Sequence, residues 1–182
     1  MDKKRIEKGR EALPYNIVLI GFMGTGKSTI ARKLARQYDM KVVEMDQELE
    51  KREQMRIPEI FEKKGENYFR DAETRFLKEI LTGTGQVISC GGGVVLREEN
   101  RKELKRNGNG RVVLLTATPE TILKRTRNSH HRPLLEKNKS IEAIQEMMEQ
   151  RREKYESAAD MMVATDDKTA EKICREIMEI FD

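Results

Sequence analysis

The stretch NIVLIGFMGTGKST, residues 16–29, decides the fold. It begins as an apolar, strand-like run and continues into a segment that fits the pattern G-x-x-x-x-G-K-[ST] with Gly21, Gly26, Lys27 and Ser28. The glycines let backbone N–H groups turn toward phosphates at a helix N-terminus, while the lysine and the hydroxyl serve the phosphates and Mg²⁺. A glycine-rich turn with a chance lysine is the alternative interpretation, and the strand before and helix after disfavour it. The motif therefore predicts a phosphate-binding loop (P-loop) for a nucleoside triphosphate.

Outside this stretch, short β-branched runs alternate with longer amphipathic patterns. The expected strands are residues 16–20, 41–44, 86–89, 111–116 and 161–164. The expected helices are residues 27–38, 46–54, 58–64, 66–81, 98–107, 119–127, 140–159 and 169–181. Because the central strands are apolar nearly throughout, we expect them to be buried on both faces of a parallel sheet. The pattern predicts an α/β fold with a five-stranded parallel sheet flanked by helices, in which ligands bind at the carboxyl ends of the strands.

Composition excludes several classes of protein. The 182 residues suit one domain, expected over residues 14–182 after a charged extension over residues 1–13. Lys plus Arg number 36 and Asp plus Glu 32, and the two signs are interleaved, so the charge case for binding nucleic acid is weak. No run approaches the roughly 18 apolar residues of a membrane span. A charged start without an apolar signal region, together with two widely separated cysteines, predicts a cytoplasmic protein with no membrane partner.

Chemistry-bearing residues follow the expected second and third strands. VVEMDQELE brings Glu44 and Asp46 to the exit of the second strand. Neither the third nor the fourth strand ends in the Asp that usually closes a Walker B strand, so an acidic metal partner must come from the second. GENYFRDAET places Arg70 one helical turn before Glu73, and three consecutive glycines, residues 91–93, follow the third strand. Consecutive glycines after a strand permit close approach of a substrate to the backbone.

These motifs together resemble the shikimate kinase family. The resemblance rests on GFMGTGKST, an acid-x-Asp followed by Leu-Glu, IPEIFEKKGENYFRDAE, a strand ending in GGG, RPLL, and a late R-x-x-x-Y, over about residues 16–166. It implies a P-loop kinase fold like that of nucleoside monophosphate kinases, with a substrate-binding helical segment at about 46–81 and a lid at about 128–139. It also implies Mg²⁺-assisted transfer of the ATP γ-phosphoryl group to the 3-hydroxyl of shikimate, in aromatic amino-acid biosynthesis.

The resemblance further implies roles for individual residues. Asp46 would orient the attacking oxygen, and Arg70 and Arg151 would clamp the substrate carboxylate. The expected catalytic residues are Asp46, Lys27 and Arg132, the last reaching over the phosphates from the lid. The expected nucleotide-binding residues are Gly24, Thr25, Gly26, Lys27, Ser28, Thr29, Arg125 (packing on the adenine) and Arg132. The expected substrate-binding residues are Asp46, Arg70, Gly91, Gly92, Gly93 and Arg151. Mg²⁺ would be held by Ser28 and, through water, by Glu44.

Several alternatives stay open at this point. Arg70 also fits a structural ion pair with Glu66, Asp71 or Glu73, and the glycines also fit a plain tight turn. Arg152 rivals Arg151, although the spacing to Tyr155 favours Arg151.

One departure from the family concerns the metal side of the site. The family usually has Asp-x-Asp, so Glu44 at the first position puts metal affinity in doubt, but not the class of reaction. His130 and His131 are adjacent in a polar lid and receive no role. The lid is expected to be mobile without ligands and to close over bound nucleotide and substrate.

The alternative functions are a kinase for another small hydroxy acid and a nucleotide-dependent binding protein that has lost catalysis. The expected partners are ATP or ADP and shikimate, and the expected oligomeric state is a monomer.

Overall fold

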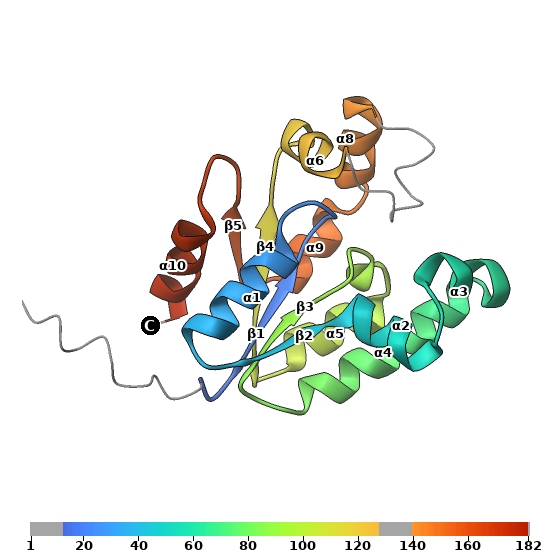
Figure 1. The fold of residues 1–182 in the computed structure, drawn as a ribbon, viewed down its shortest axis with the longest axis horizontal. Coiled ribbons are helices and arrows are strands. Elements are labelled where there is room, and N and C mark those ends of the chain that lie inside the picture. The colour runs from blue at the N-terminus through green and yellow to red at the C-terminus, as the bar shows by residue number, and fades with distance from the viewer. Residues whose placement is uncertain (1–12, 128–139, 182) are drawn as a thin grey trace, which may run out of the picture.

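The computed structural model describes residues 13–127 and 140–181. Its core is one five-stranded parallel sheet in the order β2-β3-β1-β4-β5 (Figure 1). The strands are β1 (Asn16–Ile20), β2 (Lys41–Glu44), β3 (Gln86–Ser89), β4 (Gly110–Thr116) and β5 (Met161–Ala164). The predicted fold class is confirmed, and β4 begins one residue earlier than expected.

Most helices also lie where the apolar periodicity placed them, within one residue at each end. They are α1 (Lys27–Gln37), α2 (Met45–Glu53), α3 (Ile57–Lys64), α4 (Glu66–Leu81), α5 (Glu98–Arg106), α6 (Pro119–Thr126) and α10 (Ala170–Phe181). A short 3₁₀ turn, η2 (Val94–Leu96), follows the three glycines and was not predicted. Thr118 caps α6 by accepting from the Thr121 N–H, and a proline occupies the first turn, as this sequence pattern predicts.

The prediction of a single helix over residues 140–159 is wrong. The structure has two helices there, α8 (Ile141–Glu149) and α9 (Arg152–Ala158). Between them Arg151 has φ −110° and ψ −7°, and its N–H donates to the Met148 carbonyl at 3.2 Å. No Gly or Pro lies at the break, so local propensity gave no signal for it. The break instead accompanies a tertiary contact of Arg151 described below.

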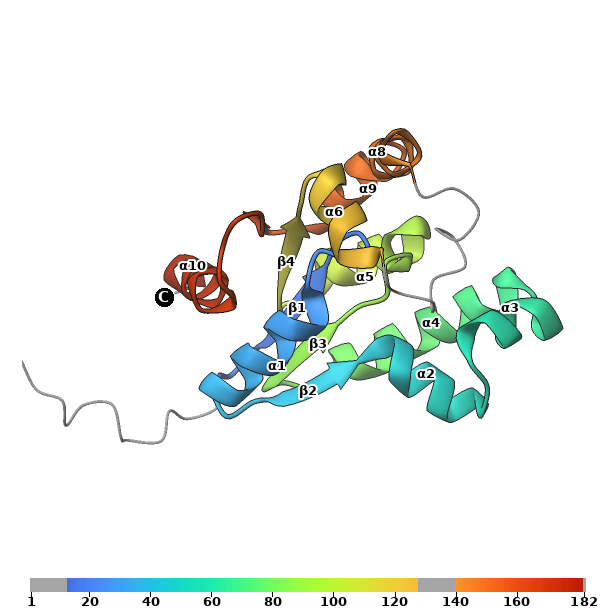
Figure 2. The same ribbon diagram turned by 45° about the horizontal axis from the view of Figure 1, so that its top comes forward.

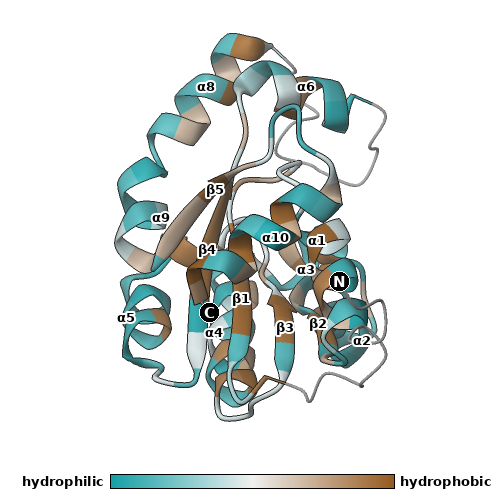
Figure 3. Ribbon diagram, turned by 90° about the vertical axis from the view of Figure 1, so that its left-hand side faces the viewer, coloured by the Kyte–Doolittle hydropathy of each residue, from teal (hydrophilic) through white to brown (hydrophobic). Residues whose placement is uncertain are grey.

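The sheet is covered on both faces, and β1 shows this residue by residue. Ile17 and Leu19 pack in the apolar cluster that includes α1 and α10. Val18 and Ile20 point the other way, into the cluster that includes α2, α3, α4, α5 and α9. Figure 3 shows the apolar strands between helices whose outer surfaces are largely hydrophilic. Two-sided burial of the central strand is thus confirmed, whereas on the edge strand β5 Met162 is 58% exposed.

The topology places two loops side by side at the carboxyl edge of the sheet. β1 pairs with β3 in a register that sets Leu19 against Ser89, so the loops that follow these strands are neighbours. A Cβ at Gly92 would lie 3.5 Å from the backbone N of Met23, which is a P-loop residue. Figure 2 shows α2, α3 and α4 grouped beyond β2 and β3, with α6 and α8 at the far side. Among the described residues, no helix is long and apolar enough to cross a membrane.

Candidate active site

The P-loop joins β1 to α1 through a glycine-dependent turn. Gly24 and Gly26 have φ values of +81° and +98°, in the left-handed region that other residues rarely adopt. At Gly21 a Cβ would lie 2.3 Å from the Leu115 carbonyl oxygen, so this position also requires glycine. The Lys27 ammonium donates to the carbonyls of Gly21 and Phe22 at 2.7 and 3.0 Å. The lysine therefore already lies over the loop. When a triphosphate binds there, its oxygens would replace these carbonyls as hydrogen-bond acceptors.

Two threonines of the predicted nucleotide site have different surroundings. Thr25 is buried, and its hydroxyl donates to the Phe22 carbonyl at 2.8 Å, which stabilises the turn itself. Thr29 lies exposed in the first turn of α1. The side chain of Thr25 thus shapes the loop, while Thr29 borders the open side of the helix start.

Ser28 and Glu44, the predicted metal residues, are brought together. The Ser28 hydroxyl donates to Glu44 Oε2 at 2.7 Å and lies 3.5 Å from Ser89 Oγ. Glu44 Oε1 is 3.0 Å from the Arg32 guanidinium, although it is buried without a hydrogen-bond partner among the described residues. Within residues 13–127 and 140–181, no group of three or more His, Cys, Asp or Glu could hold a metal ion. This pair of hard oxygen ligands fits Mg²⁺, which usually keeps several waters and takes its remaining ligands from phosphates.

Asp46 stands beside the glycine loop because α2 begins directly after β2. Met45 is fully buried at the start of the helix, and Asp46 follows it in the first turn on an exposed position. A Cβ at Gly91 would lie 2.5 Å from Asp46 Oδ1 and 3.2 Å from Glu73 Oε1. Glycine at position 91 therefore lets two carboxylates approach the backbone from α2 and from α4.

Arg70 reaches the same loop from α4. Its side chain is buried, and its Nη1 donates to Glu73 Oε2 at 2.8 Å while Glu66 Oε1 accepts at 3.3 Å from both Nε and Nη2. A Cβ at Gly93 would lie 2.4 Å from Arg70 Nη1, so the guanidinium lies against the glycine backbone. The structural ion pair considered from sequence does exist, with Glu73 and Glu66, and it holds Arg70 toward the loop. Asp71 pairs with Arg97 instead, at 2.5 Å.

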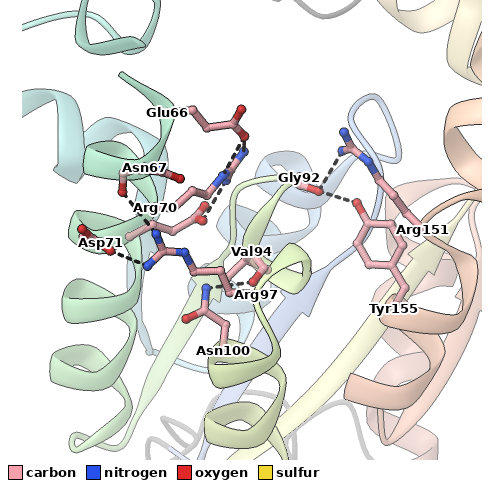
Figure 4. A network of polar contacts seen from close by, with 11 residues as sticks. Glu66, Asn67, Arg70, Asp71, Gly92, Val94, Arg97, Asn100, Arg151 and Tyr155 are labelled. Atoms are coloured by element: carbon pink, nitrogen blue, oxygen red, sulfur yellow. Dashed lines mark hydrogen bonds and ion pairs between the residues drawn. The ribbon is translucent and has the colours of Figure 1, made fainter. Parts of the chain in front are cut away.

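Arg151 lies on the opposite side of the glycine loop (Figure 4). Its Nη1 lies 3.5 Å from the Gly92 carbonyl oxygen, and its guanidinium carbon is 5.8 Å from the ring centroid of Phe22. The rival Arg152 is exposed and pairs with Glu149. The break between α8 and α9 thus turns Arg151, and not Arg152, toward the glycines. Two guanidinium groups therefore flank a short glycine loop next to a P-loop.

The family model described as shikimate kinase matches residues 23–182. The chain belongs to the shikimate kinase family. The shikimate kinase of Persephonella marina is 40% identical over 163 residues, covering 90% of this chain and 96% of that protein. The structure of the Acinetobacter baumannii shikimate kinase in complex with shikimate has a TM-score of 0.87 at 34% identity and covers 94% of both chains. That of the Aquifex aeolicus shikimate kinase has a TM-score of 0.77 at 38% identity, covering 91% of this chain and 95% of that one.

Of the two arginines predicted outside the P-loop for the nucleotide, the structure describes Arg125. Arg125 is exposed on α6 and donates to the Thr165 carbonyl and hydroxyl, both at 2.9 Å, and to the Gly24 carbonyl at 3.3 Å. It therefore links the P-loop to the segment that follows β5. Arg132, the histidines 130 and 131, and the lid predicted over residues 128–139 all lie outside the described residues.

The sequence interpretation gave no role to the Tyr155 hydroxyl, which contacts the Gly92 carbonyl. The R-x-x-x-Y spacing put Tyr155 one helical turn after Arg151, but spacing alone does not reveal what the hydroxyl contacts. It also missed Arg32 as a partner of Glu44. Glu73 was expected only as a partner of Arg70, although its Oε1 lies beside Gly91.

Glu73 is a buried carboxyl group of this site with a strongly raised pKa. Its side chain is 1% exposed, and its Oε1 has no hydrogen-bond partner among the described residues. Burial raises the pKa of Glu73 to about 7; Arg70 opposes the shift, and the Asp46 carboxylate adds to it. When the group is ionised, this oxygen has no hydrogen bond among the described residues to offset its loss of water.

Glu73 should therefore make stability depend on pH. Because its folded-state pKa lies above its ordinary 4.5, ionisation costs the folded state free energy as pH rises from about 4.5 to about 7. Relative to Glu73→Gln, the wild type should lose on the order of 3 kcal/mol of unfolding free energy between about pH 5 and about pH 8. Urea unfolding at the two pH values measures this difference. Glu66→Gln, which removes the exposed partner of Arg70, is the matched control, and equal pH slopes for wild type and Glu73→Gln would contradict the assignment.

Proposed function

We propose that this chain transfers the γ-phosphoryl group of ATP to the 3-hydroxyl of shikimate, giving shikimate 3-phosphate and ADP. The observation that carries this proposal is the position of Arg70 and Arg151, which flank the glycine loop directly beside the P-loop. A small hydroxy acid whose carboxylate is held between the two guanidinium groups would have its hydroxyl groups near Asp46 and near the phosphates of ATP. Membership of the shikimate kinase family and the likeness to a shikimate-bound structure support this acceptor.

The nucleotide would bind over the P-loop. Lys27 would exchange its hydrogen bonds to the Gly21 and Phe22 carbonyls for hydrogen bonds to phosphate oxygens. The free-energy cost would be small, because the ammonium group already lies over the P-loop. Ser28 and Glu44 would hold Mg²⁺, which neutralises charge on the phosphate oxygens when bound. The exposed guanidinium of Arg125 would pack on the adenine while its bonds to Thr165 fix its plane. Arg132 belongs to this proposal as the cation that covers the phosphates.

Asp46 would orient the acceptor and take its proton. Phosphoryl transfer passes through a loose transition state, so positioning and charge neutralisation contribute more than a strong base. One carboxylate next to the acceptor hydroxyl is therefore sufficient. Asp46 is well placed for this role, because Gly91 leaves room for its carboxylate beside the backbone of the glycine loop.

The substrate carboxylate would be held by the two arginines. A planar guanidinium binds a carboxylate with two parallel hydrogen bonds, which a lysine does not do. Glu73 and Glu66 already hold Arg70 against Gly93, so little side-chain freedom is lost when the substrate binds. We place the substrate-binding segment at α2, α3 and α4, together with the glycine loop.

The test is ATP consumption, measured as ADP formed, with and without shikimate. We expect strong stimulation by shikimate, and loss of turnover when EDTA removes Mg²⁺. A panel of other small hydroxy acids, run at equal concentrations, tests the alternative acceptor. Turnover with another acid but not with shikimate would replace the acceptor while leaving the kinase chemistry intact. Binding of ATP with no turnover on any acceptor would contradict the proposal.

A further inference from the structure

The hydroxyl of Tyr155 ends at the backbone of the glycine loop. Tyr155 lies on α9, one turn after Arg151, and its N–H donates to the Arg151 carbonyl at 3.0 Å. Its ring is buried, at 4% exposure, in the apolar cluster that also contains Val94 and Val95. From there the hydroxyl donates to the Gly92 carbonyl at 2.5 Å. Figure 4 shows this contact beside that of Arg151.

The Gly92 carbonyl has two donors, and the tyrosine is the stronger one. Arg151 Nη1 lies 3.5 Å from the oxygen, at the outer limit of a hydrogen bond. Tyr155 is much closer, and its phenol is fixed by the packing of its ring. Burial raises the pKa of Tyr155 to about 12, with a further increase from Glu73, although Arg151 and Arg70 oppose it. The hydroxyl therefore stays protonated and remains a donor throughout the physiological pH range.

This contact fixes the direction of one peptide group. In a trans peptide the carbonyl of Gly92 and the N–H of Gly93 point in opposite directions. In Figure 4 the Gly92 carbonyl points toward α9 and away from Arg70. The Gly93 N–H is accordingly turned to the side of α4, where the Arg70 guanidinium lies against Gly93. The Val94 N–H donates to the Gly91 carbonyl at 3.1 Å and closes a turn over Gly92 and Gly93. Glycine allows the central peptide of such a turn to face either way, so a donor from outside the loop favours one orientation.

We propose that Tyr155 is a positioning residue for the acceptor substrate: its hydroxyl holds the Gly92–Gly93 peptide, and with it Arg151, in the orientation that receives the substrate. This inference rests on the proposed function, because it assigns the glycine loop to the acceptor. The hydrogen bond of the Tyr155 hydroxyl goes to the Gly92 backbone, in the loop that follows β3. Its effect should therefore fall on the acceptor and not on the nucleotide.

The decisive variant is Tyr155→Phe, which removes only the hydroxyl. Losing one hydrogen bond that organises the site should raise the KM for shikimate about 3- to 10-fold. The KM for ATP and kcat should change by less than about twofold, because nucleotide contacts and the transition state are unaffected. Hydrogen exchange of residues 91–96 should become faster in Tyr155→Phe without shikimate, independently of any activity assay.

Tyr38→Phe is the matched control. Tyr38 is also buried, but it packs on the opposite face of the sheet with α1 and α10. Removing its hydroxyl should leave the KM for shikimate unchanged, whatever it does to the melting temperature. An unchanged KM for shikimate in Tyr155→Phe, or parallel increases for shikimate and ATP, would overturn the proposal. If wild type turned over a different hydroxy acid, the proposed function would fail, but the same comparison with that acid would still test Tyr155.

Discussion

Asp46→Asn is expected to lower kcat for shikimate phosphorylation by about 10²- to 10⁴-fold, the usual contribution of a positioned proton acceptor. Asparagine keeps the size of the side chain and one acceptor oxygen, but it cannot accept the proton of the attacking hydroxyl. The KM for ATP should change little, since Lys27 and Ser28 lie on a separate element, at the start of α1. Steady-state kinetics at saturating shikimate and ATP measure the effect.

The control for Asp46→Asn is Glu48→Gln, on the same helix. Glu48 pairs with Lys51 and is partly exposed, so neutralising it alters the charge of α2 without touching the glycine loop. Its kcat should stay within about twofold of wild type, as for most surface substitutions. A loss of less than about tenfold in Asp46→Asn would show that the proton leaves by another route.

Arg70→Ala is expected to raise the dissociation constant for shikimate by about 10- to 150-fold, because a charge-assisted hydrogen bond contributes roughly 1.5 to 3 kcal/mol. The dissociation constant for ATP should remain nearly unchanged. Arg70→Lys should recover only part of the affinity, since an ammonium group cannot present the planar, two-bond geometry of a guanidinium. Calorimetric titration with each ligand separates the two affinities.

The matched control for Arg70→Ala is Arg75→Ala, which changes an exposed arginine of the same helix. Arg70→Ala also leaves Glu73 buried without its cation, so the pKa of that carboxyl should rise further and stability near neutral pH should fall. Thermal unfolding measured alongside the titrations distinguishes this cost from the loss of affinity. A parallel fall in ATP and shikimate binding would mean that Arg70 is only structural.

The elements that the sequence predicted well are those with a local cause. The P-loop requires glycines and a lysine at fixed spacing, and the central strands are apolar on both faces. Consecutive residues of the sequence therefore indicate both features. The break between α8 and α9 has no local cause, because Gln150 and Arg151 are ordinary helix formers. It accompanies the contact of Arg151 with a loop from a distant part of the chain, which no local pattern reveals.

The site was predictable to a similar degree. Arg70 and Glu73 are three residues apart on one helix, so their pairing could be expected from spacing alone. Tyr155 and Gly92 are 63 residues apart, and no periodicity relates them. The unpartnered oxygen of Glu73 likewise depends on how α4 packs against the glycine loop. Residue types and order therefore indicated the chemistry, while the orientation of the groups depended on tertiary packing.

The pairing of β1 with β3 has a consequence for how the two substrates meet. The P-loop, proposed for the phosphoryl donor, and the glycine loop, proposed for the acceptor, extend from adjacent strands. Main-chain hydrogen bonds fix these strands in register, about 4.8 Å apart. A slip of one residue would move one loop by about 3.3 Å along the other and turn every strand side chain to the wrong face. Such a ladder in the middle of a sheet opens only with the whole molecule. The spacing between the loop that binds the phosphoryl donor and the loop that binds the acceptor is thus as stable as the fold itself.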